Sequence, residues 1–103
     1  GDTDMLVRTM DQGRSLARTL GNRRVALMRG HGAAVVGNAI REVVVASVYM
    51  EHSARLQIQA TALGPIKFLS DGEVEKMSSG VLTHPLAAER AWGTWAARVG
   101  RAD

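Results

Sequence analysis

One histidine of the sequence lies in a setting that could serve chemistry. The stretch VALMRGHGAAVVG, residues 25–37, places His31 between Gly30 and Gly32, with runs of β-forming residues on both sides. Glycine permits backbone angles that other residues avoid, so this pattern predicts a tight turn from which the imidazole projects. Imidazole is the commonest metal ligand among side chains. His31 is therefore a candidate metal ligand, and the alternative is a hairpin turn that merely contains a histidine.

Arg29 precedes His31 by two residues and is a candidate for binding the substrate. A guanidinium group can hold a carboxylate or phosphate through two parallel hydrogen bonds; the alternative is a solvated surface arginine. The other two histidines, His52 and His84, show no ligand spacing with His31, and we expect both at the surface. Catalytic metal sites normally use three protein ligands. The sequence alone therefore identifies neither a complete metal site nor a catalytic residue.

Other polar and aromatic residues have simpler interpretations. Glu51 and Arg55 are four residues apart in a predicted helix, in the order that favours an ion pair. Tyr49 is expected in the core, with a phenol at the site as the alternative. Trp92 and Trp95 are expected to pack against other elements rather than to stack on bases.

Helices and short strands must position the predicted turn. Apolar residues at three- and four-residue spacing predict a helix at 3–20, and the two runs around His31 predict strands at 25–28 and 33–36. A longer helix is expected at 39–63, apolar on nearly every side of its first half and therefore buried against more than one partner. The later expected elements are a strand at 66–69, a helix at 71–79 opened by a capping box of Ser70 and Glu73, and a helix that begins at His84-Pro85. The order is α-β-β-α-β-α-α, which indicates an α/β chain of layered α+β type.

The bulk composition limits the function classes. The 103 residues are 46% hydrophobic and 22% charged, as in an ordinary globular domain. The net charge of +3 is scattered and aromatic residues make up 4%, so we expect no nucleic-acid partner. No stretch is apolar enough to predict a membrane span, and the absence of cysteine fits a reducing compartment. We therefore expect no membrane partner and a cytoplasmic location.

The expected elements cannot bury all of their own apolar surface. Two or three short strands are too few to cover a long helix that is apolar all round, and the first helix needs a surface as well. The sequence therefore predicts part of a larger layered fold, or one chain of an intimate oligomer.

The segments LMRGHGAAVVG and AIREVVVASVYMEHSARLQIQATALG resemble the C-terminal half of the class II aldolase/adducin family. The resemblance runs from the first helix to about Trp95, and it implies a partial αβα sandwich in which residues 1–103 lack the family's N-terminal half. The RGHG turn, the ARLQIQATALGPIKFLS run and the late tryptophans are more similar to the branch that acts on hydroxy-aromatic carboxylates. The aldolases more often show an Asn-His-Gly turn, and Arg29 is where this sequence departs from the aldolase pattern.

The resemblance implies a function as well as a fold. It makes His31 a ligand of a divalent metal, zinc first and manganese or iron as alternatives, with the remaining ligands in the family's upstream half. It implies a carbon–carbon lyase, a decarboxylase or an aldolase, that acts on a small anionic substrate through a metal-stabilised enolate. The whole protein is then expected to be an enzyme, whereas the 103-residue chain alone is expected to be inactive.

Two other functions remain open. An adducin-like assembly module without catalysis and an iron-dependent oxygenase on the same scaffold are both compatible with these residues. The family further implies a homo-oligomer, a tetramer in its known members, or association with the N-terminal segment.

Overall fold

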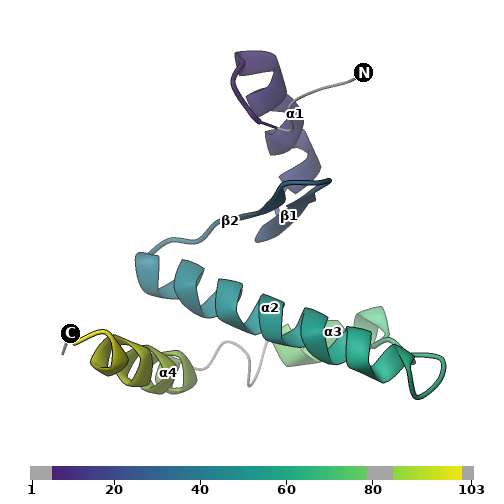
Figure 1. Ribbon diagram of the computed structural model, residues 1–103, viewed down its shortest axis with the longest axis vertical. Helices are drawn as coiled ribbons and strands as arrows, with labels where there is room; N and C mark the ends of the chain where they lie inside the picture. Colours follow the sequence, from purple (N-terminus) through teal and green to yellow (C-terminus); the bar gives the residue numbers. More distant parts are fainter. Residues whose placement is uncertain (1–5, 79–84, 101–103) are drawn as a thin grey trace. The chain divides into compact units, whose positions relative to one another are not determined.

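A computed structural model describes residues 6–78 and 85–100 of the chain (Figure 1). The described elements follow the order α-β-β-α-α-α. The chain divides after Val43 into two compact units. Mixed helices and a small antiparallel sheet confirm the α+β class, whereas the αβα sandwich stays a prediction.

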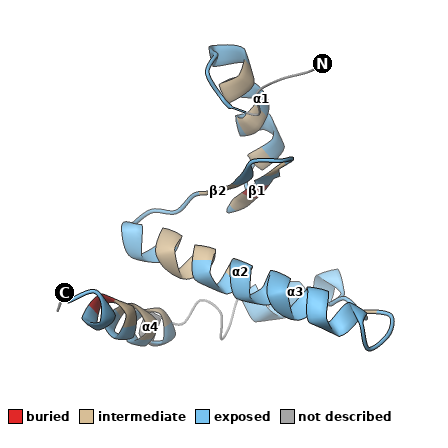
Figure 2. Ribbon diagram, viewed as in Figure 1, coloured by how far each residue is buried: buried red, intermediate tan, exposed pale blue. Residues whose placement is uncertain are grey.

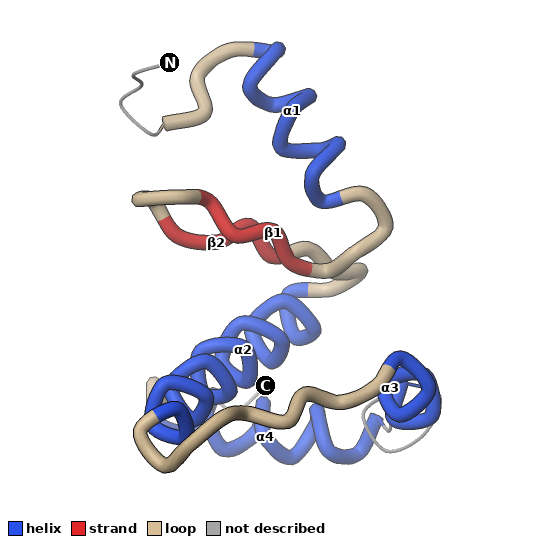
Figure 3. The backbone as a smooth tube through the Cα atoms, turned by 90° about the vertical axis from the view of Figure 1, so that its right-hand side faces the viewer, coloured by secondary structure: helices blue, strands red, loops and turns tan. Residues whose placement is uncertain are grey.

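The first unit contains helix α1 (Met10–Leu20), strand β1 (Val25–Met28) and strand β2 (Gly32–Val35). The strands pair antiparallel, with Val25 opposite Val35 and Met28 opposite Gly32, as the sequence predicts (Figure 3). β2 begins and ends one residue earlier than expected. Helix α1 contacts β1, so at least one helix lies against this hairpin.

The expected helix at 3–20 is wrong at its start, because the chain is not helical at residues 6–8. The helix begins after Thr9, whose side chain accepts a hydrogen bond from the Gln12 N–H over 3.2 Å. The Gln12 side chain in turn accepts from the Thr9 N–H over 3.0 Å, which completes a capping box. Reciprocal hydrogen bonds of this kind fix the first turn of the helix there.

The second unit is helical in its described part. Helix α2 (Ile40–Thr61) begins just ahead of the division, and helices α3 (Asp71–Ser78) and α4 (Pro85–Arg98) follow it. The predicted capping box before α3 is present: the Ser70 N–H donates to the Glu73 carboxylate over 2.8 Å, and the Glu73 N–H donates to the Ser70 hydroxyl over 3.3 Å. The bounds of helices α2 and α4 agree with the sequence prediction to within about two residues at the ends that are described.

The strand expected at 66–69 is wrong, and this removes one element from the predicted order. The segment IKFL has the composition of a strand, but a strand needs a neighbour to accept and donate its backbone hydrogen bonds. Among the described residues, the only sheet is the pair of β1 and β2. The segment therefore runs as irregular chain between α2 and α3.

Very little of the described chain is buried. The buried apolar residues are Ala26 on β1 and Ala96 on α4 (Figure 2). Helix α2 has no buried residue, so the expectation that its first half is buried against several partners is wrong for this chain. The side chains at 43–47 are half-buried, and those at 51–61 are all exposed. The structure agrees with the prediction that the chain's own elements cannot cover its apolar surface.

A helix that crosses a bilayer must be both long and apolar. Within residues 6–78 and 85–100, no helix combines the two properties to the extent that crossing requires.

Candidate metal-ligand turn

The candidate site is the turn that joins β1 to β2. Arg29, Gly30 and His31 form this turn between the paired residues Met28 and Gly32. The His31 N–H donates a hydrogen bond to the Met28 carbonyl oxygen over 3.1 Å. This bond closes the turn across the end of the ladder, so the position of His31 is set by the backbone.

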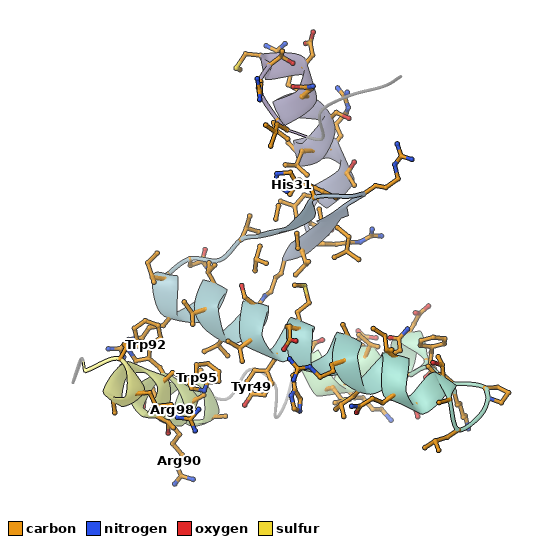
Figure 4. The ribbon with its side chains drawn as sticks, in the orientation of Figure 1. His31, Tyr49, Arg90, Trp92, Trp95 and Arg98 are labelled. Carbon is orange, nitrogen blue, oxygen red and sulfur yellow. The ribbon has the colours of Figure 1, made fainter. Side chains whose placement is uncertain are left out.

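The two glycines satisfy the backbone geometry of the turn. Gly30 has φ of 69° and Gly32 has φ of 153°, in a region that residues with a side chain rarely adopt. His31 lies between them, and its side chain is exposed (Figure 4). The glycines thus take up the unfavourable conformations, and the histidine is presented to solvent, as the sequence predicts.

Arg29 lies in the same turn and is exposed as well. The structure therefore places the two sequence-predicted site residues on the same short loop, within three residues of each other. An exposed imidazole offers a lone pair to a metal ion, and an exposed guanidinium offers paired donors to a carboxylate. This combination suits a small anion that also binds a metal.

The described residues do not supply a full set of metal ligands. No group of three or more histidine, cysteine, aspartate or glutamate side chains gathers in residues 6–78 and 85–100. His52 is exposed on α2, as expected, and His84 lies outside the described residues. The turn fits a metal as a single ligand, not as a complete site.

The other end of the hairpin is held by a contact that the sequence analysis did not predict. The Glu42 carboxylate accepts a hydrogen bond from the Asn38 N–H over 2.9 Å. A Cβ built on Gly37 would lie 3.2 Å from the Cβ and Oε2 of Glu42 and from Cγ2 of Val43. Gly37 therefore permits a close approach between the chain leaving β2 and the first turn of α2. The sequence signal for this contact is the glycine at position 37, five residues before Glu42 in the first turn of the helix.

In the second unit, the prediction that Tyr49 lies in the core is wrong. Its residue surface is 54% exposed. The Tyr49 ring on α2 lies 6.3 Å from the Trp95 ring on α4, centroid to centroid, at an interplanar angle of 60° (Figure 4). Trp92 and Trp95 are half-buried, so the expectation that the tryptophans pack is confirmed. The predicted ion pair between Arg55 and Glu51 is also present.

Comparison with known proteins identifies the family to which the chain belongs. Residues 2–58 match the family described as Class II Aldolase and Adducin N-terminal domain. A curated relative, the decarboxylase tropJ of Talaromyces stipitatus, is 34% identical over 77 residues. That match covers 67% of this chain and 29% of the relative, so the chain spans less than a third of its length. The chain belongs to the class II aldolase/adducin family.

Proposed function

We propose that this chain is part of a divalent-metal-dependent lyase that breaks a carbon–carbon bond, as a decarboxylase or an aldolase. Three observations support the proposal: membership of the class II aldolase/adducin family, similarity to a relative named as a decarboxylase, and the position of His31. The observation that carries it is the backbone-fixed turn between two glycines, from which an exposed imidazole is presented.

His31 is the residue that would hold the metal. An imidazole suits zinc first, with manganese or iron as alternatives. Because residues 6–78 and 85–100 hold no group of three or more potential ligands, we propose that the partners of His31 come from further parts of the whole protein. This agrees with the proposal that residues 1–103 correspond to the C-terminal half of the family's domain.

Arg29 would bind the substrate. Its guanidinium carries a permanent positive charge two residues from His31, and it can pair with the carboxylate of a small anion. A divalent metal, when bound, offsets the negative charge that develops beside the breaking bond. Arg29 would orient the carboxylate relative to His31. A hydroxy-aromatic carboxylate is the substrate class that we propose, by decarboxylation.

We also propose that the protein associates, as a homo-oligomer of the tetrameric kind or with the segment that holds the other ligands. Large apolar side chains such as Ile40, Val48, Leu56 and Ile58 are exposed along α2. Large apolar side chains that a chain leaves exposed are often covered by another chain or segment. A monomer at low micromolar concentration in sedimentation would contradict the proposal. A cytoplasmic location stays a prediction.

The lyase activity is tested in the whole protein with a hydroxy-aromatic carboxylate as substrate. We expect metal-dependent release of carbon dioxide without consumption of oxygen, and loss of that release in His31→Ala. His52→Ala is the matched control, because it removes an exposed histidine from α2 and leaves the turn intact. Consumption of oxygen would instead indicate the iron-dependent oxygenase. Assembly without turnover of carboxylate or aldol substrates would indicate the adducin-like module.

A further inference from the structure

The two glycines beside His31 adopt different backbone conformations. Gly30 has φ of 69°, in the left-handed region that asparagine and aspartate also enter. Gly32 has φ of 153°, which lies outside that region and which residues with a side chain rarely adopt. The turn therefore needs a residue that tolerates the left-handed region at position 30, and it needs glycine itself at position 32.

The glycine at position 32 is needed for its conformation rather than for space. Apart from its neighbours in the chain, no described atom lies within 4 Å of a Cβ built on Gly32. Gly64, beyond the end of α2, shares both properties, with φ of 144° and equally open space. Gly21 at the end of α1 has φ of 56°, close to that of Gly30, and its Cβ would meet the Arg18 carbonyl oxygen at an ordinary 3.9 Å. Gly21 and Gly64 thus carry a similar conformation outside the candidate site.

Gly30 lies inside the turn that carries the candidate ligand. The His31 N–H donates to the Met28 carbonyl oxygen over 3.1 Å, so Arg29 and Gly30 are the central residues of a four-residue turn. A positive φ at the third of the four residues is the mark of a type II turn, which takes glycine or asparagine there. A negative φ at residue 30 would turn over the peptide group between residues 29 and 30. The backbone that leads into His31 would then differ from the one observed.

We propose that Gly30 and Gly32 are positioning residues for the metal ligand His31, and that they accept different side chains. The inference rests on the proposed function, because it takes His31 as a ligand. A residue such as alanine at either position favours another conformation of the metal-free turn. Only a fraction of the protein then holds the turn that binds the ion, and the apparent affinity falls by that fraction. Asparagine is accepted at position 30 and not at position 32.

Competition with a chromophoric chelator measures the affinity of the whole protein for zinc. We expect Gly30→Ala to raise the zinc dissociation constant about tenfold, and Gly30→Asn to leave it within about twofold of the wild type. Gly32→Ala and Gly32→Asn should both raise it about tenfold or more. Gly21→Ala and Gly64→Ala are the matched controls, since each adds a Cβ at a similar φ outside the turn. Both controls should lower the free energy of unfolding and leave the zinc affinity unchanged.

Nuclear magnetic resonance of the metal-free 103-residue chain observes the turn itself. In a type II turn the second residue has ψ of about 120°, which brings its Hα close to the N–H of the third residue. We expect a strong nuclear Overhauser effect between the Arg29 Hα and the N–H of residue 30 in the wild type and in Gly30→Asn. The effect should be much weaker in Gly30→Ala. An equally strong effect in Gly30→Ala would show that alanine is accepted at this position, and it would overturn the inference.

The zinc measurements separate failure of the inference from failure of the proposed function, with His31→Ala measured beside the glycine variants. Equal weakening of zinc binding in all four alanine variants of glycine would indicate a general loss of stability and overturn the inference. Unchanged zinc affinity in Gly30→Ala, together with loss of zinc in His31→Ala, would overturn the inference and leave the proposed function standing. Full retention of zinc in His31→Ala would overturn the proposed function and the inference with it.

Discussion

The His31 N–H donates to the Met28 carbonyl oxygen over 3.1 Å, and this hydrogen bond joins the candidate metal ligand to the last residue of β1. The bond spans a turn in which Gly30 adopts φ of 69°. A main-chain hydrogen bond and a glycine conformation thus hold the backbone of the turn that carries the imidazole. A preformed ligand loses less conformational entropy on binding than one on a mobile loop.

The close approach at Gly37 should make this position sensitive to a single methyl group. The Cβ of Gly37→Ala would lie 3.2 Å from the Glu42 Cβ, which cannot move without the helix backbone. We expect a loss of about 1 kcal/mol or more in the free energy of unfolding, measured by urea denaturation. Gly13→Ala is the control: Gly13 lies inside α1, and a methyl group added there would meet nothing within 4 Å, so that change should raise stability by about 0.5–1 kcal/mol. Equal effects at the two positions would contradict this account.

The capping box should determine where α1 begins. Thr9→Ala removes the side-chain oxygen that accepts the Gln12 N–H, and we expect a cost of about 1 kcal/mol in unfolding free energy and less helix by circular dichroism. Thr19→Ala makes the same chemical change later in α1, where the hydroxyl donates only to the Ser15 carbonyl oxygen. It should leave the helix unchanged or slightly stronger, since alanine has the higher helix propensity. Similar losses in both variants would exclude a special role for the cap.

The ring contact between Tyr49 and Trp95 should stabilise the second unit. Tyr49→Ala removes a ring whose centroid lies 6.3 Å from that of Trp95, and we expect a loss of about 0.5–1.5 kcal/mol in unfolding free energy together with a changed near-ultraviolet circular dichroism signal. Tyr49→Phe keeps the ring and removes only the hydroxyl of an exposed side chain, so it should behave like the wild type. A loss of equal size in Tyr49→Phe would show that the hydroxyl, rather than the ring, is the stabilising group.

The hairpin could be predicted from the sequence because its determinants are local. Two β-forming runs and the glycines around His31 are enough to define the strands, the turn and the exposed imidazole. The capping box before α3 is local as well, since Ser70 and Glu73 satisfy each other's backbone N–H groups. Thr9 and Gln12 carry the same kind of signal, and recognising it would have corrected the expected start of α1.

The other errors concern contacts between residues that are distant in the sequence. The apolar run at 66–69 does not indicate whether a strand is available to pair with it, and in the part of the chain that the structure describes β1 and β2 pair only with each other. Tyr49 lies in a helix rich in apolar residues, yet its exposure depends on what covers α2 rather than on its neighbours in sequence. The partners of His31 in a metal site depend in the same way on residues distant in the chain, so local spacing identifies the first ligand and not the set.

The central claim is that His31 is a metal ligand, and elemental analysis of the whole protein tests it most directly. We predict one divalent ion per chain in the wild type and in the control His52→Ala, and loss of most of that ion in His31→Ala with the fold retained by circular dichroism. The 103-residue chain alone should hold little metal, because a single imidazole binds weakly without the chelate formed by further ligands. Full retention of the metal in His31→Ala would contradict the claim and leave the turn as a structural feature of the hairpin.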